Sequence, residues 1–265
     1  MIKLENYCVS GWEAAIRGMR NPMNSWNKSD TVFRIDDGPV GYDISRKPID
    51  LYGGMEWDNS LYISHEQMIL GERDYNLMMH LARAGSVDAK YRRMINVTVD
   101  ITAPLYWWKE FDTYKVGTVA NSCSTMHKIA AKEFTLDDFS LEHLISITEM
   151  NKMTENKPSL VYDFSDEEHP NNLIETCPLG ILVEVISMLN ICRDLFIKTK
   201  DKKYWWQMIQ LLPSSYNQKR TVQMNYEVLA GIYPKRKEHK LDEWRGFCEW
   251  IKILPYSEII TLLNK

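Results

Sequence analysis

Two segments of the chain concentrate residue types that could bind a phosphate group. In the first, residues 103–128, an aromatic stretch is followed by hydroxyl, amide and cationic side chains. The polar members are Lys115, Asn121, Ser122, Ser124, Thr125, His127 and Lys128. Such groups beside the backbone N–H groups of a helix start would suit a phosphate. The alternative is that Trp107 and Trp108 belong to the core and that the hydroxyls only cap a helix.

The second segment, residues 212–244, is dense in cations. Its basic residues are Lys219, Arg220, Lys235, Arg236, Lys237, His239 and Lys240. A run of charges usually forms a solvated helix face, and residues 235–240 fit that simpler interpretation on charge alone. The same cations could instead form a local basic pocket for one phosphorylated ligand.

The chain lacks the common sequence motifs of metal sites, nucleotide-binding loops and serine nucleophiles. His127, His143, His169 and His239 lie far apart and show no metal-ligand spacing, so we expect no metal site. The glycine patterns of Rossmann folds and P-loops do not occur, and neither does a G-x-S-x-G elbow. If the protein is an enzyme, we expect a cofactor to perform the chemistry while the protein provides position and electrostatics.

The composition is that of an ordinary globular protein, since 45% of the 265 residues are hydrophobic and 26% are charged. Lys and Arg number 32 against 36 Asp and Glu, and the net charge of −4 does not suit a general surface for duplex nucleic acid. No stretch approaches the roughly 18 apolar residues of a membrane span. The five cysteines are widely spaced, which favours a cytoplasmic location.

The elements that must position these residues begin with a helix and a strand of clear pattern. Residues 72–84 are predicted to be a helix that a glycine ends. Between residues 95 and 101, Ile and Val alternate with polar residues, which predicts a strand. A helix over residues 105–114 should follow it. Near the N-terminus, residues 10–13 (SGWE) have the pattern of a capping box and predict a helix after them.

The second half of the chain is predicted to be mainly helical. The expected helices are residues 179–200, 204–212, 221–232 and 241–254, and the last three stop before prolines. Residues 27–58 and 151–175 lack a helical period and are expected to be irregular. The predicted fold class is α+β, a helix-rich single domain (1–265) around a small antiparallel or mixed sheet.

Read together, the two segments resemble the flavin-dependent thymidylate synthases. In that family a strand and an Ala-Pro-like turn, here residues 97–104, lead through a helix to the signature R-H-R-x-x-S-x-N-E-x-S-x-R-Y. The R-H-R triplet aligns with Thr113, Tyr114 and Lys115, and N-E-x-S aligns after one insertion with Asn121, Ser122, Cys123 and Ser124. A Gln three residues before the triplet is matched by Glu110.

The C-terminal segment is also similar to that family. An L-P pair, an Asn, an Arg eleven positions later and a His occur in the family's order, here as Leu212-Pro213, Asn225, Arg236 and His239. The family's N-x-R is not complete, because Glu227 stands at its Arg position. In the first segment Thr113 and Met126 also stand where the family has Arg, and both substitutions lose the guanidinium fork.

The resemblance implies an activity and a set of partners. Members of the family are homotetramers that bind FAD at subunit interfaces and use NADPH and methylenetetrahydrofolate to convert dUMP to dTMP. The uracil is activated electrostatically, without attack by an enzyme cysteine. By resemblance, Arg236 would be catalytic and polarise the pyrimidine. The substrate would be bound by Glu110, Ser122, Ser124 and Arg236, and FAD by Thr113, Tyr114, Lys115, Asn121, Asn225 and His239.

Two other functions remain open at this point. The chain could be a relative that hydroxymethylates dUMP or dCMP, because Glu110 in place of Gln would change which pyrimidine edge is read. It could also be non-catalytic, a nucleotide-binding or oligomeric interaction module. The missing arginines at Thr113, Met126 and Glu227 motivate this second alternative.

Overall fold

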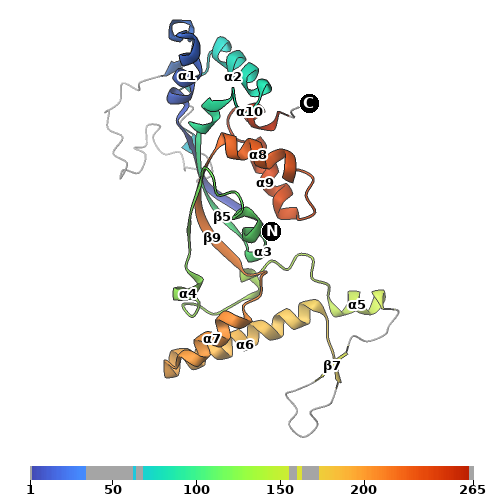
Figure 1. The fold of residues 1–265 in the computed structure, drawn as a ribbon. Helices are drawn as coiled ribbons and strands as arrows, with labels where there is room; N and C mark the ends of the chain where they lie inside the picture. Colours follow the sequence, from blue (N-terminus) through green and yellow to red (C-terminus); the bar gives the residue numbers. More distant parts are fainter. Residues whose placement is uncertain (1, 34–61, 64–67, 155–159, 163–172, 263–265) are drawn as a thin grey trace, which may run out of the picture. The chain divides into compact units, whose positions relative to one another are not determined.

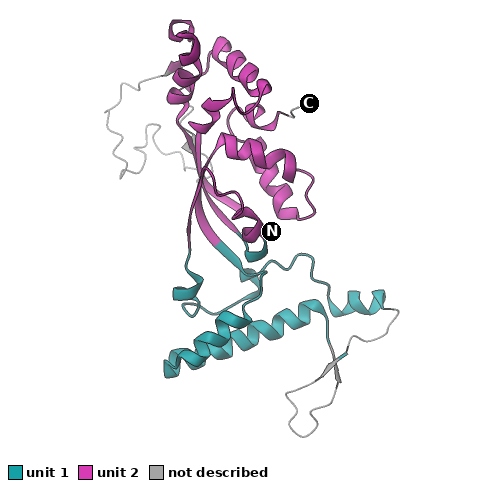
Figure 2. Cartoon of the chain, in the orientation of Figure 1, with its two compact units in different colours: residues 1, 103–106, 123–218 teal, residues 2–102, 107–122, 219–265 magenta. Residues whose placement is uncertain are grey.

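The computed structural model describes the whole chain except residues 1, 34–61, 64–67, 155–159, 163–172 and 263–265 (Figure 1). The described residues divide into two compact units (Figure 2). The larger unit comprises residues 2–102, 107–122 and 219–265, and the smaller unit comprises residues 103–106 and 123–218. The single-domain organisation of the chain stays a prediction. Most of the segments expected to be irregular, 27–58 and 151–175, lie outside the described residues.

A five-stranded sheet of order β3-β1-β5-β9-β6 organises the fold. Its strands are β1 (Lys3–Ser10), β3 (Tyr62–Ile63), β5 (Asn96–Pro104), β6 (Thr118–Ser122) and β9 (Asn217–Asn225). The β1–β5 and β6–β9 pairs are antiparallel and the β1–β3 pair is parallel, so the sheet is mixed. The α+β class and the strand at residues 95–101 are therefore confirmed.

Helices and short elements complete the larger unit. They are α1 (Trp12–Arg20), α2 (Glu72–Ala84), α3 (Leu105–Phe111), α8 (Tyr226–Arg236), α9 (Asp242–Lys252) and α10 (Glu258–Thr261). The 3-10 turns are η1 (Asn21–Met23), η2 (Trp26–Lys28) and η4 (Lys90–Arg93), and a two-stranded ribbon joins β2 (Val32–Phe33) to β4 (Met68–Ile69). The helix predicted at residues 72–84 is present with the predicted bounds, and the helix predicted at 105–114 ends at Phe111.

The core of the larger unit forms on the apolar face of the central strands. Val97, Val99 and Ile101 of β5 are fully buried, as the alternation in the sequence predicts. Helices α8 and α9 lie beside these strands in Figure 1 and add further buried residues. These include Leu229, Ile232, Trp244, Phe247 and Ile251. Burial of this face holds the strands and helices in a fixed arrangement.

The smaller unit is built around two long helices. It contains α4 (Thr125–Lys128), η5 (Leu136–Asp138), α5 (Ile147–Met153), the hairpin β7 (Leu160–Tyr162) and β8 (Leu173–Glu175), α6 (Pro178–Thr199) and α7 (Lys202–Leu211). Its core includes Phe134, Phe139, Leu182, Leu189 and Met208. None of the helices in the described part of the chain is long and apolar enough to cross a membrane.

The capping box predicted at residues 10–13 is wrong. Ser10 is the last residue of β1, and α1 begins after Gly11, which has a φ of 90° and no capping side chain. A Cβ atom on Gly11 would lie 2.1 Å from the backbone oxygen of Met94. The close approach of two backbones therefore decides where the helix starts, and a capping pattern does not report such an approach.

The helix predicted at residues 221–232 is confirmed from Tyr226 onward and is wrong for residues 221–225. Residues 217–225 form β9, in which Val222 and Met224 are buried and the intervening side chains are more exposed. Helix α8 starts at Tyr226 and continues through Pro234 to Arg236. The strand pairs with β6, a partner distant in sequence, and this pairing outweighs the helical pattern. The extension past Pro234 places Arg236 on the last turn of α8.

A buried ion pair joins α1 to α2. The Nε atom of Arg20 donates to Asp74 at 2.6 Å, and both side chains are almost completely buried. Asp74 also accepts hydrogen bonds from the hydroxyls of Ser29, at 2.6 Å, and Thr31, at 2.7 Å. Burial raises the pKa of Asp74, but the hydrogen bonds from Ser29, Thr31 and Arg20 outweigh burial, and the pKa lies below its usual value.

We expect the contribution of the Arg20–Asp74 pair to the free energy of unfolding to be lost in acid. Because the folded pKa of Asp74 is lowered, its contribution to the free energy of unfolding is complete above the ordinary carboxyl pKa of about 4. It falls as the pH drops through the lower folded value. We expect Asp74→Asn to cost about 2–3 kcal/mol at neutral pH. Urea unfolding at several pH values should show the difference from wild type shrinking in acid, and a constant difference would contradict the prediction.

Candidate functional site

Arg236, at the end of α8, is the centre of a cluster of polar side chains from three segments. Its Nε atom donates to the hydroxyl of Tyr114 at 3.0 Å, and its Nη1 atom donates to Oε2 of Glu110 at 2.5 Å. The same Nη1 atom lies 2.9 Å from Nε2 of His239. Glu110 lies on α3, Tyr114 follows that helix, and His239 lies between α8 and α9. All four residues belong to the larger unit.

An aromatic floor supports the guanidinium group. The Cζ atom of Arg236 lies 4.4 Å from the ring centroid of Trp244, which is fully buried. The indole N–H of Trp244 donates to Oε2 of Glu110 at 3.0 Å. Trp244 in turn packs against Trp107, with the ring centroids 4.8 Å apart. The site is therefore anchored directly to the aromatic core.

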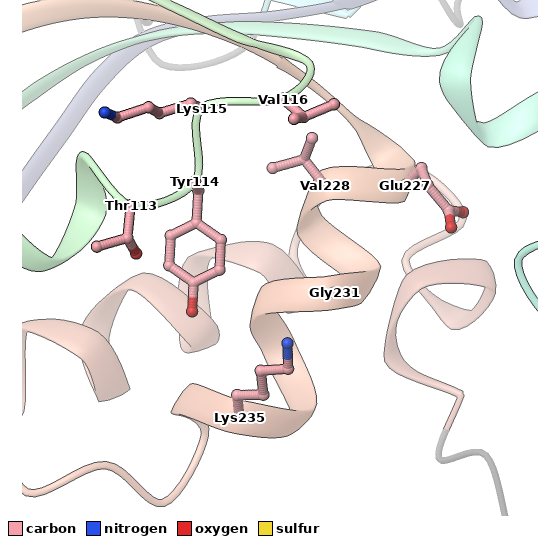
Figure 3. Close-up of a pocket in the computed structure, with 8 residues that line it drawn as sticks. All are labelled: Thr113, Tyr114, Lys115, Val116, Glu227, Val228, Gly231 and Lys235. Carbon is pink, nitrogen blue, oxygen red and sulfur yellow. The ribbon is translucent and has the colours of Figure 1, made fainter.

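A pocket of about 290 Å³ opens between α8 and the loop after α3 (Figure 3). It is lined by Thr113, Tyr114, Lys115, Val116, Glu227, Val228, Gly231 and Lys235. In Figure 3 the side chain of Lys235 extends along α8 toward Gly231, where an added Cβ would meet nothing within 4 Å. Lys115 and Lys235 form no ion pair with any of the described residues. Unpaired ammonium groups at a pocket wall suit an anionic ligand.

The structure brings four of the predicted site residues into direct contact, namely Glu110, Tyr114, Arg236 and His239. Thr113 and Lys115 line the adjacent pocket together with Tyr114. Asn225 is the N-cap of α8 and accepts a hydrogen bond from the Val228 N–H at 3.0 Å. This cap lies next to Gly117, whose φ of 77° is readily adopted by glycine.

The remaining predicted residues do not join this cluster. Asn121 and Ser122 lie on β6, opposite Thr221 and Arg220 of β9, and both are exposed. Ser124 belongs to the smaller unit, where its side chain caps α4 by accepting from the His127 N–H. The interpretation of Ser124 as a helix cap is thus confirmed.

Several residues that matter here were not proposed from the sequence. Trp244 and Lys235 lie inside the cation-rich segment, but residue type alone does not distinguish a tryptophan or one lysine of a charge run as a site residue there. Arg92 of η4 is buried and lies 3.6 Å from Glu227, measured from Nη1 to Oε2. The charge reversal at Glu227 is therefore balanced by a cation 135 residues earlier, which no local pattern reveals.

One of the expected alternatives is resolved by burial. Trp107 and Trp108 are core residues, since their exposed fractions are 0% and 1%. Arg220 stacks on Trp108, with Cζ 4.1 Å from the ring centroid, and donates to Asp112 at 2.7 Å. That cation therefore has a structural role at the edge of the aromatic core.

A buried cysteine near the site is not a nucleophile at neutral pH. Burial raises the pKa of Cys248 on α9 to about 12, so its thiol stays protonated. Burial also raises the pKa of Cys8 and of Cys192. The arrangement around Arg236 therefore suits electrostatic activation of a bound group more than covalent attack.

Comparison with solved structures identifies the architecture. The flavin-dependent thymidylate synthase ThyX from Helicobacter pylori, crystallised with FAD and dUMP, superposes with a TM-score of 0.54 over 98% of this chain and 96% of its own, at 12% identity. The chain has the fold of ThyX. The UMP/dUMP methylase PolB from Streptomyces cacaoi, bound with 5-Br dUMP, is also similar, with a TM-score of 0.52, 98% and 95% coverage and 11% identity.

At the level of sequence the likeness is much weaker. No family model matches the chain, and no curated protein matches it. The chain therefore shares the ThyX fold at low sequence identity, and side-chain roles must be argued from the geometry of this chain.

Proposed function

We propose that the protein is a flavin-dependent enzyme that transfers a one-carbon group to a pyrimidine nucleotide. The activity we assign is conversion of dUMP to dTMP with methylenetetrahydrofolate and NADPH. The observation that carries the proposal is the convergence of Glu110, Tyr114, Arg236 and His239 beside a cationic pocket. The ThyX fold adds support, because solved proteins with that fold bind dUMP or 5-Br dUMP.

The pocket residues have the chemistry to contact a phosphate and a ring of a flavin dinucleotide. Lys115 and Lys235 provide cations that pair with none of the described residues, Tyr114 provides an aromatic face, and the surface over Gly231 is open. We assign FAD contacts to the predicted set, Thr113, Tyr114, Lys115, Asn121, Asn225 and His239. Bound FAD would supply the redox chemistry of the reaction.

The chain's own residues bind and polarise the nucleotide. Arg236 is held over Trp244 and donates to the pyrimidine carbonyl, which stabilises the negative charge that develops on the ring. Glu110 fixes the orientation of Arg236 and accepts a hydrogen bond from an N–H group of the base. We keep Ser122 and Ser124 as the predicted contacts of the nucleotide phosphate, although neither belongs to the Arg236 cluster. Cys248 takes no part, because it stays a thiol.

Flavin content is the experiment that tests this proposal. Purified protein should be yellow, should release flavin on denaturation and should regain its visible absorption when FAD is added. Addition of dUMP at a hundred times its Kd should stabilise the protein by about 2.7 kcal/mol. A colourless protein that takes up no added FAD would exclude both the methylating and the hydroxymethylating versions of the proposal.

The proposal includes assembly into a homotetramer. Helix α6 exposes five large apolar side chains in the single chain, namely Ile181, Val183, Met188, Ile191 and Ile197. Exposed apolar side chains in this number on one helix are typical of a subunit interface. Sedimentation of the purified protein measures the number of copies directly.

A non-catalytic nucleotide-binding or interaction module is the second candidate. The observation that favours it is the absence of guanidinium groups at Thr113, Met126 and Glu227. Growth of a thymidine auxotroph on this protein alone would exclude it. A hydroxymethylating relative that acts on dUMP or dCMP would be separated from a methylase by mass analysis of the nucleotide product.

A further inference from the structure

Trp244 contacts both members of the Glu110–Arg236 ion pair, through different parts of its side chain. The indole ring lies under the guanidinium group, 4.4 Å from Cζ to the ring centroid. The indole N–H donates to the carboxylate at 3.0 Å. The side chain is fully buried and packs on Trp107 and Phe247, with ring centroids 4.8 and 5.9 Å away. A side chain held this tightly can fix the orientation of the groups it touches.

The contacts on the ion pair are concentrated on one side of each group. Oε2 of Glu110 receives both Nη1 of Arg236 and the indole N–H. The Nε and Nη1 atoms of Arg236 are engaged by Tyr114, Glu110 and His239. Across the part of the chain that the structure describes, Oε1 of Glu110 and Nη2 of Arg236 have no hydrogen-bond partner.

We propose that Trp244 is a positioning residue that fixes the Glu110–Arg236 pair with one acceptor and one donor available to a pyrimidine base. This inference rests on the proposed function, because the ligand it names is the nucleotide of that reaction. A free carboxylate oxygen accepts from a ring N–H or an exocyclic amine, and a free guanidinium N–H donates to a ring carbonyl or nitrogen. The pair therefore recognises the hydrogen-bonding edge of the base, and it does not bind the phosphate.

Trp244→Phe is the variant that tests this role. It keeps an aromatic ring under Arg236 and removes the N–H that holds the carboxylate, together with part of the ring volume. We expect the Kd for dUMP, measured by calorimetry on the full chain, to rise about tenfold, which is the effect of losing one hydrogen bond to a charged group. The Kd for deoxyribose 5-phosphate, which has no base, should stay unchanged.

Trp250→Phe is the matched control. Trp250 lies on the same helix and is buried, but its indole N–H has no hydrogen-bond partner among the described residues. We expect this variant to bind dUMP within twofold of wild type. Equal losses of dUMP affinity in the two variants would overturn the inference, because they would reflect general packing of α9.

A double-mutant cycle removes the remaining ambiguity. Glu110→Ala deletes the acceptor, and since Glu110 is about one-third exposed this variant should fold even where Trp244→Phe does not. The dUMP affinity of Glu110→Ala should fall at least as much as that of Trp244→Phe. The double variant should bind dUMP no more weakly than Glu110→Ala does. Additive losses of dUMP affinity in the double variant, or unchanged dUMP affinity in Glu110→Ala, would overturn this inference but not the proposed function. Wild-type protein that does not bind dUMP at all would instead overturn the proposed function.

Discussion

Replacing Arg236 with alanine is expected to lower turnover of dUMP by about two orders of magnitude or more. That is the usual effect of removing one preorganised donor to a developing negative charge. The guanidinium is well suited to that role, because Trp244, Tyr114 and Glu110 fix its position before any ligand arrives. Product formation per enzyme-bound flavin, with NADPH in excess, is the measurement.

The variant should still fold, since most of the aromatic core around Trp244 does not depend on Arg236. Lys237→Ala is the matched control, because Lys237 adjoins Arg236 but, among the residues that the structure describes, pairs only with the exposed Glu238 at 3.5 Å. Its turnover should equal that of wild type. Arg236→Lys keeps the charge and loses the planar fork, so its turnover should stay well below wild type. Unchanged turnover in Arg236→Ala would place the active site elsewhere.

Replacing Trp107 with alanine should cost about 3–5 kcal/mol of unfolding free energy, the usual cost of deleting a large buried ring. Trp107 is fully buried and stacks on Phe111 with the ring centroids 5.0 Å apart. It also packs against Trp244, with the ring centroids 4.8 Å apart. Urea unfolding monitored by circular dichroism is the measurement, and a loss below about 1 kcal/mol would contradict the assignment of this ring to the core.

Two further variants separate ring packing from polarity. The indole N–H of Trp107 has no hydrogen-bond partner among the residues described, so Trp107→Phe forfeits volume but no hydrogen bond and should be far milder than alanine. Trp26→Ala removes a half-exposed indole that donates to Asn21 at 2.7 Å. It should cost about 1 kcal/mol or less.

Local patterns were sufficient for the elements in which the side-chain period and the burial agree. The helix at residues 72–84 ends at the predicted glycine, and the strand at 95–101 has a clear period whose apolar positions are buried. The mixed α+β class followed from these patterns. The capping box at Ser10 and the helical assignment of residues 221–225 were wrong because a backbone contact with Met94 and a strand partner distant in sequence decided them.

Through its resemblance to the flavin-dependent thymidylate synthases, the amino-acid sequence by itself proposed Glu110, Tyr114, Arg236 and His239 as site residues, together with others that do not join the cluster. Only the tertiary structure decided how they meet. Arg236 reaches Glu110 across 126 positions because α8 runs on past Pro234 and because Trp244 lies between the site and the core. The pairing of Arg92 with Glu227 is equally non-local. Such contacts depend on chain segments brought together by burial of the sheet face, and no local period encodes that distance.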